Sequence, residues 1–202
     1  MRWIGMGEVL HLGALLPAAV GTCCVLGSRR SGRVIAGVSA LVMLAAMLDA
    51  TVRMPGLPTF VWAAVLVSLA LLGAFGARLA TGSGSGPGSG RGPAEEARMA
   101  GHTAGMAVHG GVGLVVMAAL LLAMSVGSSG DAGVVASGHH GGSGWLAPLA
   151  GTVAVGYLLF SLVFARTLLS ASDRGLRTAL PALEVASMGV SAALMAAALL
   201  PA

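Results

Sequence analysis

The feature that most constrains this chain is an uninterrupted run of 23 residues, 102–124, which contains no Asp, Glu, Lys or Arg. About 20 apolar residues suffice to cross the hydrocarbon core of a bilayer as one α-helix, so the run predicts a membrane-spanning helix. Its less common side chains recur at spacings of three and four, which places them on one helix face. That face carries Met106, His109, Gly113, Met117, Leu120 and Met124.

Composition extends this prediction to the whole chain. Hydrophobic residues make up 56% and charged residues 9% of the sequence, and the mean hydropathy is +0.92. Soluble domains carry roughly a quarter charged residues, so a water-soluble fold is excluded. The net charge of +4 comes from arginines between apolar runs, without interleaved aromatics, and this excludes nucleic acid as a partner. The adjacent Cys23 and Cys24 have no third cysteine to pair with and predict no disulfide framework.

Six apolar runs predict the fold class, an all-α polytopic transmembrane bundle with six spans. The runs cover 9–27, 34–52, 59–77, 102–124, 145–165 and 180–200. Between the third and fourth lies 81–98, TGSGSGPGSGRGPAEEAR, which predicts a flexible hydrophilic linker. The expected organisation is therefore helices one to three in 1–80, the linker in 81–98, and helices four to six in 99–202. A basic cluster after the first run favours a retained anchor over a cleaved signal peptide.

The arginines also predict an orientation. Nine of the eleven fall on one side of the six spans, and only Arg2 and Arg53 fall on the other. By the positive-inside rule, the arginine-rich side with the 81–98 linker is cytoplasmic, and both termini lie outside. We therefore expect a multi-pass protein of the plasma (cytoplasmic) membrane, the inner membrane of the cell.

Ionisable and soft side chains inside the spans predict an inner cluster. His102, Met106 and His109 lie on the fourth span, and Glu184 and Met188 lie on the sixth. Both spans begin on the cytoplasmic side, so His102 should match Glu184 in depth and Met106 should match Met188. Imidazole and thioether groups suit Cu(I), which makes these five residues a candidate copper site. Intramembrane ionisable residues are costly and for that reason indicate function.

A second group lies near the outer side. Glu8 and His11 are at the start of the first span, and Asp49 is near the end of the second. Arg53 follows Asp49 by four residues, which lets the two pair on one helix face. These four residues form a candidate outer polar cluster.

Packing is the alternative explanation for the Met and Gly residues. Methionine fills irregular gaps in cores. Five glycines in or directly before the fourth span predict a contact face for another helix: Gly101, Gly105, Gly110, Gly111 and Gly113. A b-type haem is disfavoured because His102 and His109 share one helix while His11 belongs near the other membrane face. The sequence contains no nucleophile paired with a base, no paired acids and no HExxH motif, so none of these signals indicates an enzyme.

Three stretches resemble an uncharacterised actinobacterial family of small polytopic membrane proteins, defined only as a domain of unknown function. They are the His-bearing span HTAGMAVHGGVGLVVMAALLLAM, the span PLAGTVAVGYLLFSLVFARTL with Tyr157, and ALEVASMGVSAALMAAAL. The Met-bearing RVIAGVSALVMLAAM also fits. Members often open the fourth helix with two adjacent histidines, whereas His102 here is followed by Thr103. The resemblance implies a small helical bundle and no known activity.

These observations favour a non-enzymatic accessory or scaffold protein of the membrane. The alternative is a copper-handling or small-solute transport protein that uses the His/Met/Glu cluster between the fourth and sixth spans. Expected partners are the lipid bilayer and a membrane-protein partner or a second copy of the chain.

Overall fold

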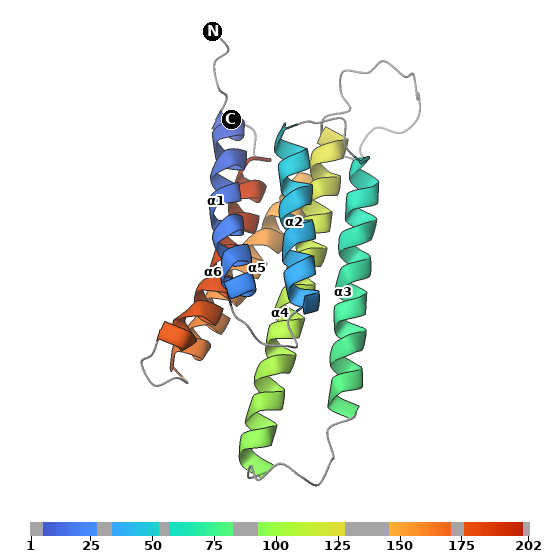
Figure 1. The fold of residues 1–202 in the computed structure, drawn as a ribbon. Coiled ribbons are helices and arrows are strands. Elements are labelled where there is room, and N and C mark those ends of the chain that lie inside the picture. Colours follow the sequence, from blue (N-terminus) through green and yellow to red (C-terminus); the bar gives the residue numbers. More distant parts are fainter. Residues whose placement is uncertain are drawn as a thin grey trace.

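The computed structural model describes residues 6–27, 34–52, 57–82, 93–127, 146–170 and 176–199. These residues form six helices, and no strand occurs among them. The helices are α1 (Met6–Gly27), α2 (Val34–Val52), α3 (Thr59–Gly82), α4 (Pro93–Gly127), α5 (Leu146–Ser170) and α6 (Leu176–Ala197). Consecutive helices run in opposite directions, as Figure 1 shows. The predicted all-α helical bundle is confirmed.

The two ends of the bundle are named here by the helix termini that they gather. The terminal end holds the start of α1 at Met6 and the end of α6 at Ala197 (Figure 1). The linker end holds the end of α3 at Gly82 and the start of α4 at Pro93. α4 and α6 therefore both begin at the linker end, and α5 ends there.

The outer surface of the bundle is apolar, as a lipid-facing surface must be. Leu16, Val34, Phe60 and Leu71 are each about two thirds exposed or more, and many other large apolar side chains also point outward. Five helices contain apolar stretches of 19 to 23 residues, enough to cross a bilayer. Within the described side chains, the apolar part of α1 is shorter, Leu12–Gly27. The chain is an integral membrane protein.

The interior is assembled from small residues and methionines. α6 packs extensively on both α1 and α5, and α3 packs on α4. A Cβ atom at Gly21 would lie 2.6 Å from Ser187 Oγ, so glycine is what lets α1 approach α6 this closely. Ser191 Oγ donates a hydrogen bond of 3.0 Å to the Ala14 carbonyl, which fastens α6 to α1 farther along.

Methionines from three helices meet in one core cluster. Its four most buried methionines, none more than 3% exposed, are Met43, Met47, Met117 and Met195. They come from α2, α4 and α6, and the one on α4, Met117, belongs to the face that the helical spacing predicted. Ser191 Oγ lies 3.8 Å from Met47 Sδ and introduces a hydroxyl into this apolar region.

Helix boundaries depart from the apolar runs mainly at the linker end. α3 continues to Gly82 and α4 begins at Pro93, so residues 93–98 of the expected linker form the first turns of α4. Residues 83–92 of that segment lie outside the described part of the chain. An apolar run marks only the portion of a helix that lies in hydrocarbon, and a helix that continues into water is longer than its run.

Candidate functional site

The predicted face of α4 is the face that the bundle buries. His109 is 2% exposed, Met117 is 2% and Leu120 is fully buried, while Met106 and Met124 at the two ends are half-buried. His109 therefore lies inside the bundle and away from lipid. It is the polar side chain around which the candidate site forms.

A serine of α5 holds the imidazole of His109. His109 Nε2 and Ser161 Oγ are 2.9 Å apart, and Ser161 Oγ donates a 2.8 Å hydrogen bond to the Tyr157 carbonyl. A hydroxyl has only one proton to donate, so Nε2 must be the donor in its bond to Ser161. In the neutral ring the free lone pair then belongs to Nδ1, which is available to accept a proton or bind a cation.

Three aromatic rings of α5 line the same side of α4. The centroids of Tyr157, Phe160 and Phe164 lie 5.2, 5.6 and 5.7 Å from that of His109, at interplanar angles below 30°. These separations are typical of stacked aromatic pairs and fix the orientation of the imidazole.

Two glycines of α4 provide the room for this arrangement. A Cβ atom at Gly105 would lie 3.1 Å from the Phe164 ring, and one at Gly113 would overlap the Tyr157 hydroxyl. By contrast, Gly101 and Gly110 have no neighbour within 4 Å of such a Cβ. Of the glycine face expected from the sequence, Gly105 and Gly113 are thus the positions that pack closely against α5, one turn on either side of His109.

The Tyr157 hydroxyl is the one buried side-chain polar atom without a hydrogen-bond partner in the part of the chain that the structure describes. The residue itself is 4% exposed. A buried hydroxyl with no partner costs about 1–3 kcal/mol in lost hydration. Such a group in a membrane interior offers a donor and an acceptor to anything bound beside it.

Helix α6 contributes Glu184 and Met188. Glu184 is 9% exposed, and its carboxyl lies within electrostatic range of Tyr157 and of Cys24 on α1. The terminal methyl of Met188 would be 3.2 Å from a Cβ at Gly113, so its side chain reaches the Tyr157 hydroxyl region. We refer to His109, Tyr157, Ser161, Glu184 and Met188 together as the His109 centre.

The remaining inner residues lie farther toward the linker end. Met106 packs against a separate cluster that includes Ala182 and Val185. Because Met188 lies beside Gly113, seven residues after Met106, the two methionines are separated by about 10 Å along α4 rather than matched in depth. His102 is in α4, but its side chain lies outside the description. Three of the five predicted residues, His109, Glu184 and Met188, thus belong to the centre.

In the outer group, Asp49 has a partner that the sequence did not indicate. Trp62 Nε1 of α3 donates a 2.7 Å hydrogen bond to Asp49 Oδ2, which ties α2 to α3 near the terminal end. Arg53, the expected partner, lies outside the described residues. The backbones of Glu8 and His11 are part of α1, and their side chains also fall outside the description.

The donor set limits which metals suit the interior. Among the residues described, no three His, Cys, Asp or Glu side chains come together as a metal site. A hard divalent ion, which prefers several oxygen ligands, is therefore poorly matched to the His109 centre. The centre instead brings one imidazole, one methionine side chain and one carboxyl into the neighbourhood of Tyr157. The thioether is a soft donor and the imidazole a borderline one, and both bind copper.

Sequence reasoning missed Ser161 and Trp62 as partners. Both lie between apolar neighbours in apolar helices, and serine hydroxyls in such helices commonly bond to their own backbone. Tyr157, the only tyrosine of the chain, was noticeable, but its neighbours were not.

Comparisons with protein-family models, with curated proteins and with solved structures find no match to this chain.

Proposed function

We propose that this protein binds and transports a small cation through the His109 centre, and that Cu(I) is the cation its donors fit best. The observation that supports the proposal most is the state of His109. It is a fully enclosed imidazole whose Nε2 is held by Ser161 and whose Nδ1 remains available. Burying such a group in a membrane bundle is costly and indicates a functional role.

The neighbouring side chains favour a cation over an anion. Glu184 brings a carboxyl within electrostatic range of Tyr157, and Met188 brings its side chain with the thioether to the region of the Tyr157 hydroxyl. Imidazole and thioether together are the ligands that select Cu(I) among biological cations. The Tyr157 hydroxyl adds a polar contact that no described protein group uses.

A route across the membrane is supported by the methionine cluster. Met117 lies one turn beyond Gly113 on α4, and Met47 and Met195 belong to the same buried cluster. These thioethers extend from the His109 centre toward the terminal end. A soft ion leaving the centre therefore meets further soft donors along the bundle interior.

The direction of movement depends on the orientation, for which the arginine distribution is the support. We propose that the protein lies in the plasma membrane with the linker end in the cytoplasm and both termini outside. The centre is then on the cytoplasmic side of the bilayer midplane, because His109 is six residues, about 9 Å, from the start of the apolar stretch of α4.

Competition titration tests the binding step. Purified protein in detergent is titrated with Cu(I) held by a coloured Cu(I) chelator. We expect one ion per chain, and His109→Ala and Met188→Leu should each abolish or strongly weaken its binding. Ser161→Ala, which removes the group that orients His109, should weaken it about 10- to 100-fold. Met43→Leu makes the same Met-to-Leu exchange in the buried core of α2 and should leave binding unchanged.

Proteoliposomes that enclose a Cu(I) indicator test the transport step, with protein-free vesicles and His109→Ala vesicles as controls. Uptake should require His109 and saturate with Cu(I). The proposal is refuted if the folded protein binds no more Cu(I) than empty micelles do, or if the His109→Ala variant binds and transports as the parent does.

The accessory or scaffold role is a second proposal. Its expected contact face on α4 included Gly105 and Gly113, and both of these positions pack against α5 of the same chain. A scaffold must therefore use the lipid-facing surface. If the chain is a scaffold, another membrane protein should co-purify with it stoichiometrically, and the His109→Ala variant should retain that protein.

A further inference from the structure

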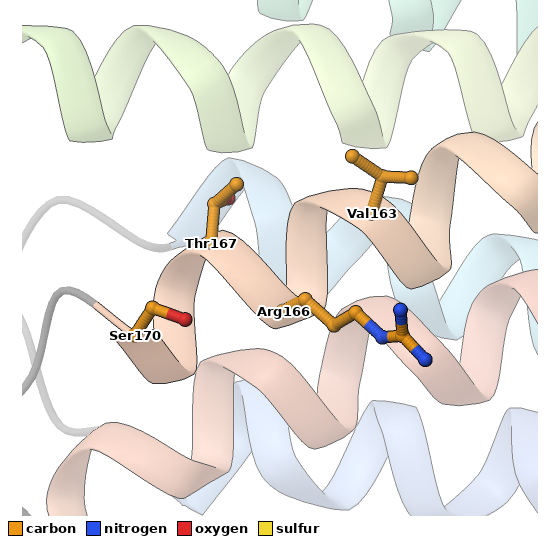
Figure 2. A pocket seen from close by; sticks show the side chains of 4 residues that line it. All are labelled: Val163, Arg166, Thr167 and Ser170. Atoms are coloured by element: carbon orange, nitrogen blue, oxygen red, sulfur yellow. The ribbon is translucent and has the colours of Figure 1, made fainter.

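A surface depression on the last two turns of α5 has no role in the proposed transport. Its lining consists of Val163, Arg166, Thr167 and Ser170. Figure 2 shows the Arg166 side chain extended along the helix away from Ser170, with the side chains of Thr167 and Val163 on a neighbouring face. The depression lies near the linker end of the bundle, where α5 ends at Ser170.

The depression has unused hydrogen-bonding capacity and a positive charge. Arg166 is exposed, and neither its guanidinium nor the Ser170 hydroxyl has a hydrogen-bond or ion-pair partner among the residues described. Thr167 Oγ1 already donates a 2.7 Å bond to the Phe164 carbonyl, so it can act only as an acceptor toward a further group. A guanidinium carries five N–H donors in a fork that fits the oxygens of a phosphate.

The surface next to this charge is apolar. Val163 is 62% exposed and Leu159, one turn farther into the membrane, is 58% exposed. Both share a helical face with Thr167 and Ser170 because they are spaced by three or four residues. A molecule that fits this surface therefore has an anionic head at the membrane boundary and a hydrocarbon chain that runs toward the bilayer centre.

We infer that the depression binds the headgroup of an anionic phospholipid, with the phosphate on the Arg166 guanidinium, the outer headgroup hydroxyls near Ser170 and an acyl chain against Val163 and Leu159. In the proposed orientation this is the cytoplasmic leaflet, where anionic lipids give the surface its negative potential. Basic depressions beside transmembrane helices on that side commonly bind anionic headgroups. The inference is independent of Cu(I) binding, because no residue of the His109 centre lines the depression.

Lipid retention measured by native mass spectrometry tests this site. The protein is released from mixed micelles that contain equal amounts of phosphatidylglycerol and phosphatidylcholine of the same chain length. We expect one preferentially retained phosphatidylglycerol per chain. Arg166→Gln should lower the association constant of this lipid about fivefold, which is the contribution of one arginine at an anionic membrane surface. Ser170→Ala should lower the constant to a smaller extent.

Arg78→Gln is the matched control. Arg78 is an exposed arginine near the end of α3 at the same end of the bundle, and the substitution removes the same charge outside the depression. Equal losses of phosphatidylglycerol in the Arg166 and Arg78 variants would mean that net charge alone explains the retention, and would overturn the site. Equal retention of phosphatidylcholine would also overturn it. Displacement of the lipid by millimolar glycerol phosphate would show that the acyl chain is not recognised, and would overturn the assignment to a lipid.

Discussion

Replacing Gly113 by alanine gives the sharpest test of how α4 and α5 meet. The added Cβ would overlap the Tyr157 hydroxyl and would lie 3.1 Å from Tyr157 Cζ and 3.2 Å from Met188 Cε. The end of Met188 is flexible and can move aside. The ring of Tyr157 is buried and stacked on His109, so relief requires α4 and α5 to move apart.

The magnitude follows from two opposing effects. Overpacking a core by one methyl group typically costs about 1–3 kcal/mol. Alanine in place of glycine returns up to about 1 kcal/mol through its higher helix propensity. We therefore expect Gly113→Ala to lower the free energy of unfolding by about 1–2 kcal/mol.

A double-mutant cycle identifies the cause of that loss. Tyr157→Phe deletes the hydroxyl with which the Cβ collides, and since this hydroxyl has no described partner, the single variant should be as stable as the parent or slightly more stable. In the Tyr157→Phe background, the cost of Gly113→Ala should fall below about 0.5 kcal/mol, which corresponds to a coupling energy of about 1 kcal/mol or more. Unfolding in mixed micelles by SDS titration, followed by far-UV circular dichroism, measures all four proteins.

Gly110→Ala serves as the control on the same helix, because a Cβ there meets nothing within 4 Å. It should be neutral or stabilising. The reasoning fails if Gly113→Ala is as stable as the parent. It also fails if Tyr157→Phe leaves the cost of that substitution unchanged.

Two further predictions concern the terminal end and the orientation. Trp62→Phe removes the hydrogen bond to Asp49 and should lower the free energy of unfolding by about 1–3 kcal/mol in the same SDS titration. Asp49→Asn keeps an acceptor and should lower it less. A Trp62→Phe variant as stable as the parent would contradict this bond. With Cys23 and Cys24 replaced by alanine, Ser89→Cys should react with a membrane-impermeant maleimide only after cell lysis, and labelling of intact cells would reverse the proposed orientation.

The spans and their buried faces could be predicted because hydrophobic length and helical spacing are local properties of a sequence. The second apolar run covers 34–52, and α2 occupies Val34–Val52. The three-four stripe on α4 is its buried face, and His109 lies within it. The first turns of α4 were missed because Glu95, Glu96 and Arg98 interrupt the apolar run without interrupting the helix.

The partners of these faces could not be predicted, because hydrophobicity carries no information on the register between helices. Depth alone pairs Met106 with Met188, yet Met188 lies beside Gly113. The serine that holds His109 is 52 residues away, on a helix that no sequence pattern singles out as its neighbour. Short-range spacing likewise gives no sign of Trp62, which reaches Asp49 from α3.

The length of α4 has a mechanical consequence. At 1.5 Å per residue its 35 residues extend about 52 Å, against roughly 30 Å of hydrocarbon, so one continuous rod carries His109 inside the bilayer and several turns beyond it. Because α4 is helical over all 35 residues, tilt or rotation of its outlying turns is passed along its axis. A force applied to those outlying turns therefore shifts the position of the His109 imidazole. A partner on the aqueous side of the membrane could act on the buried ring in this way.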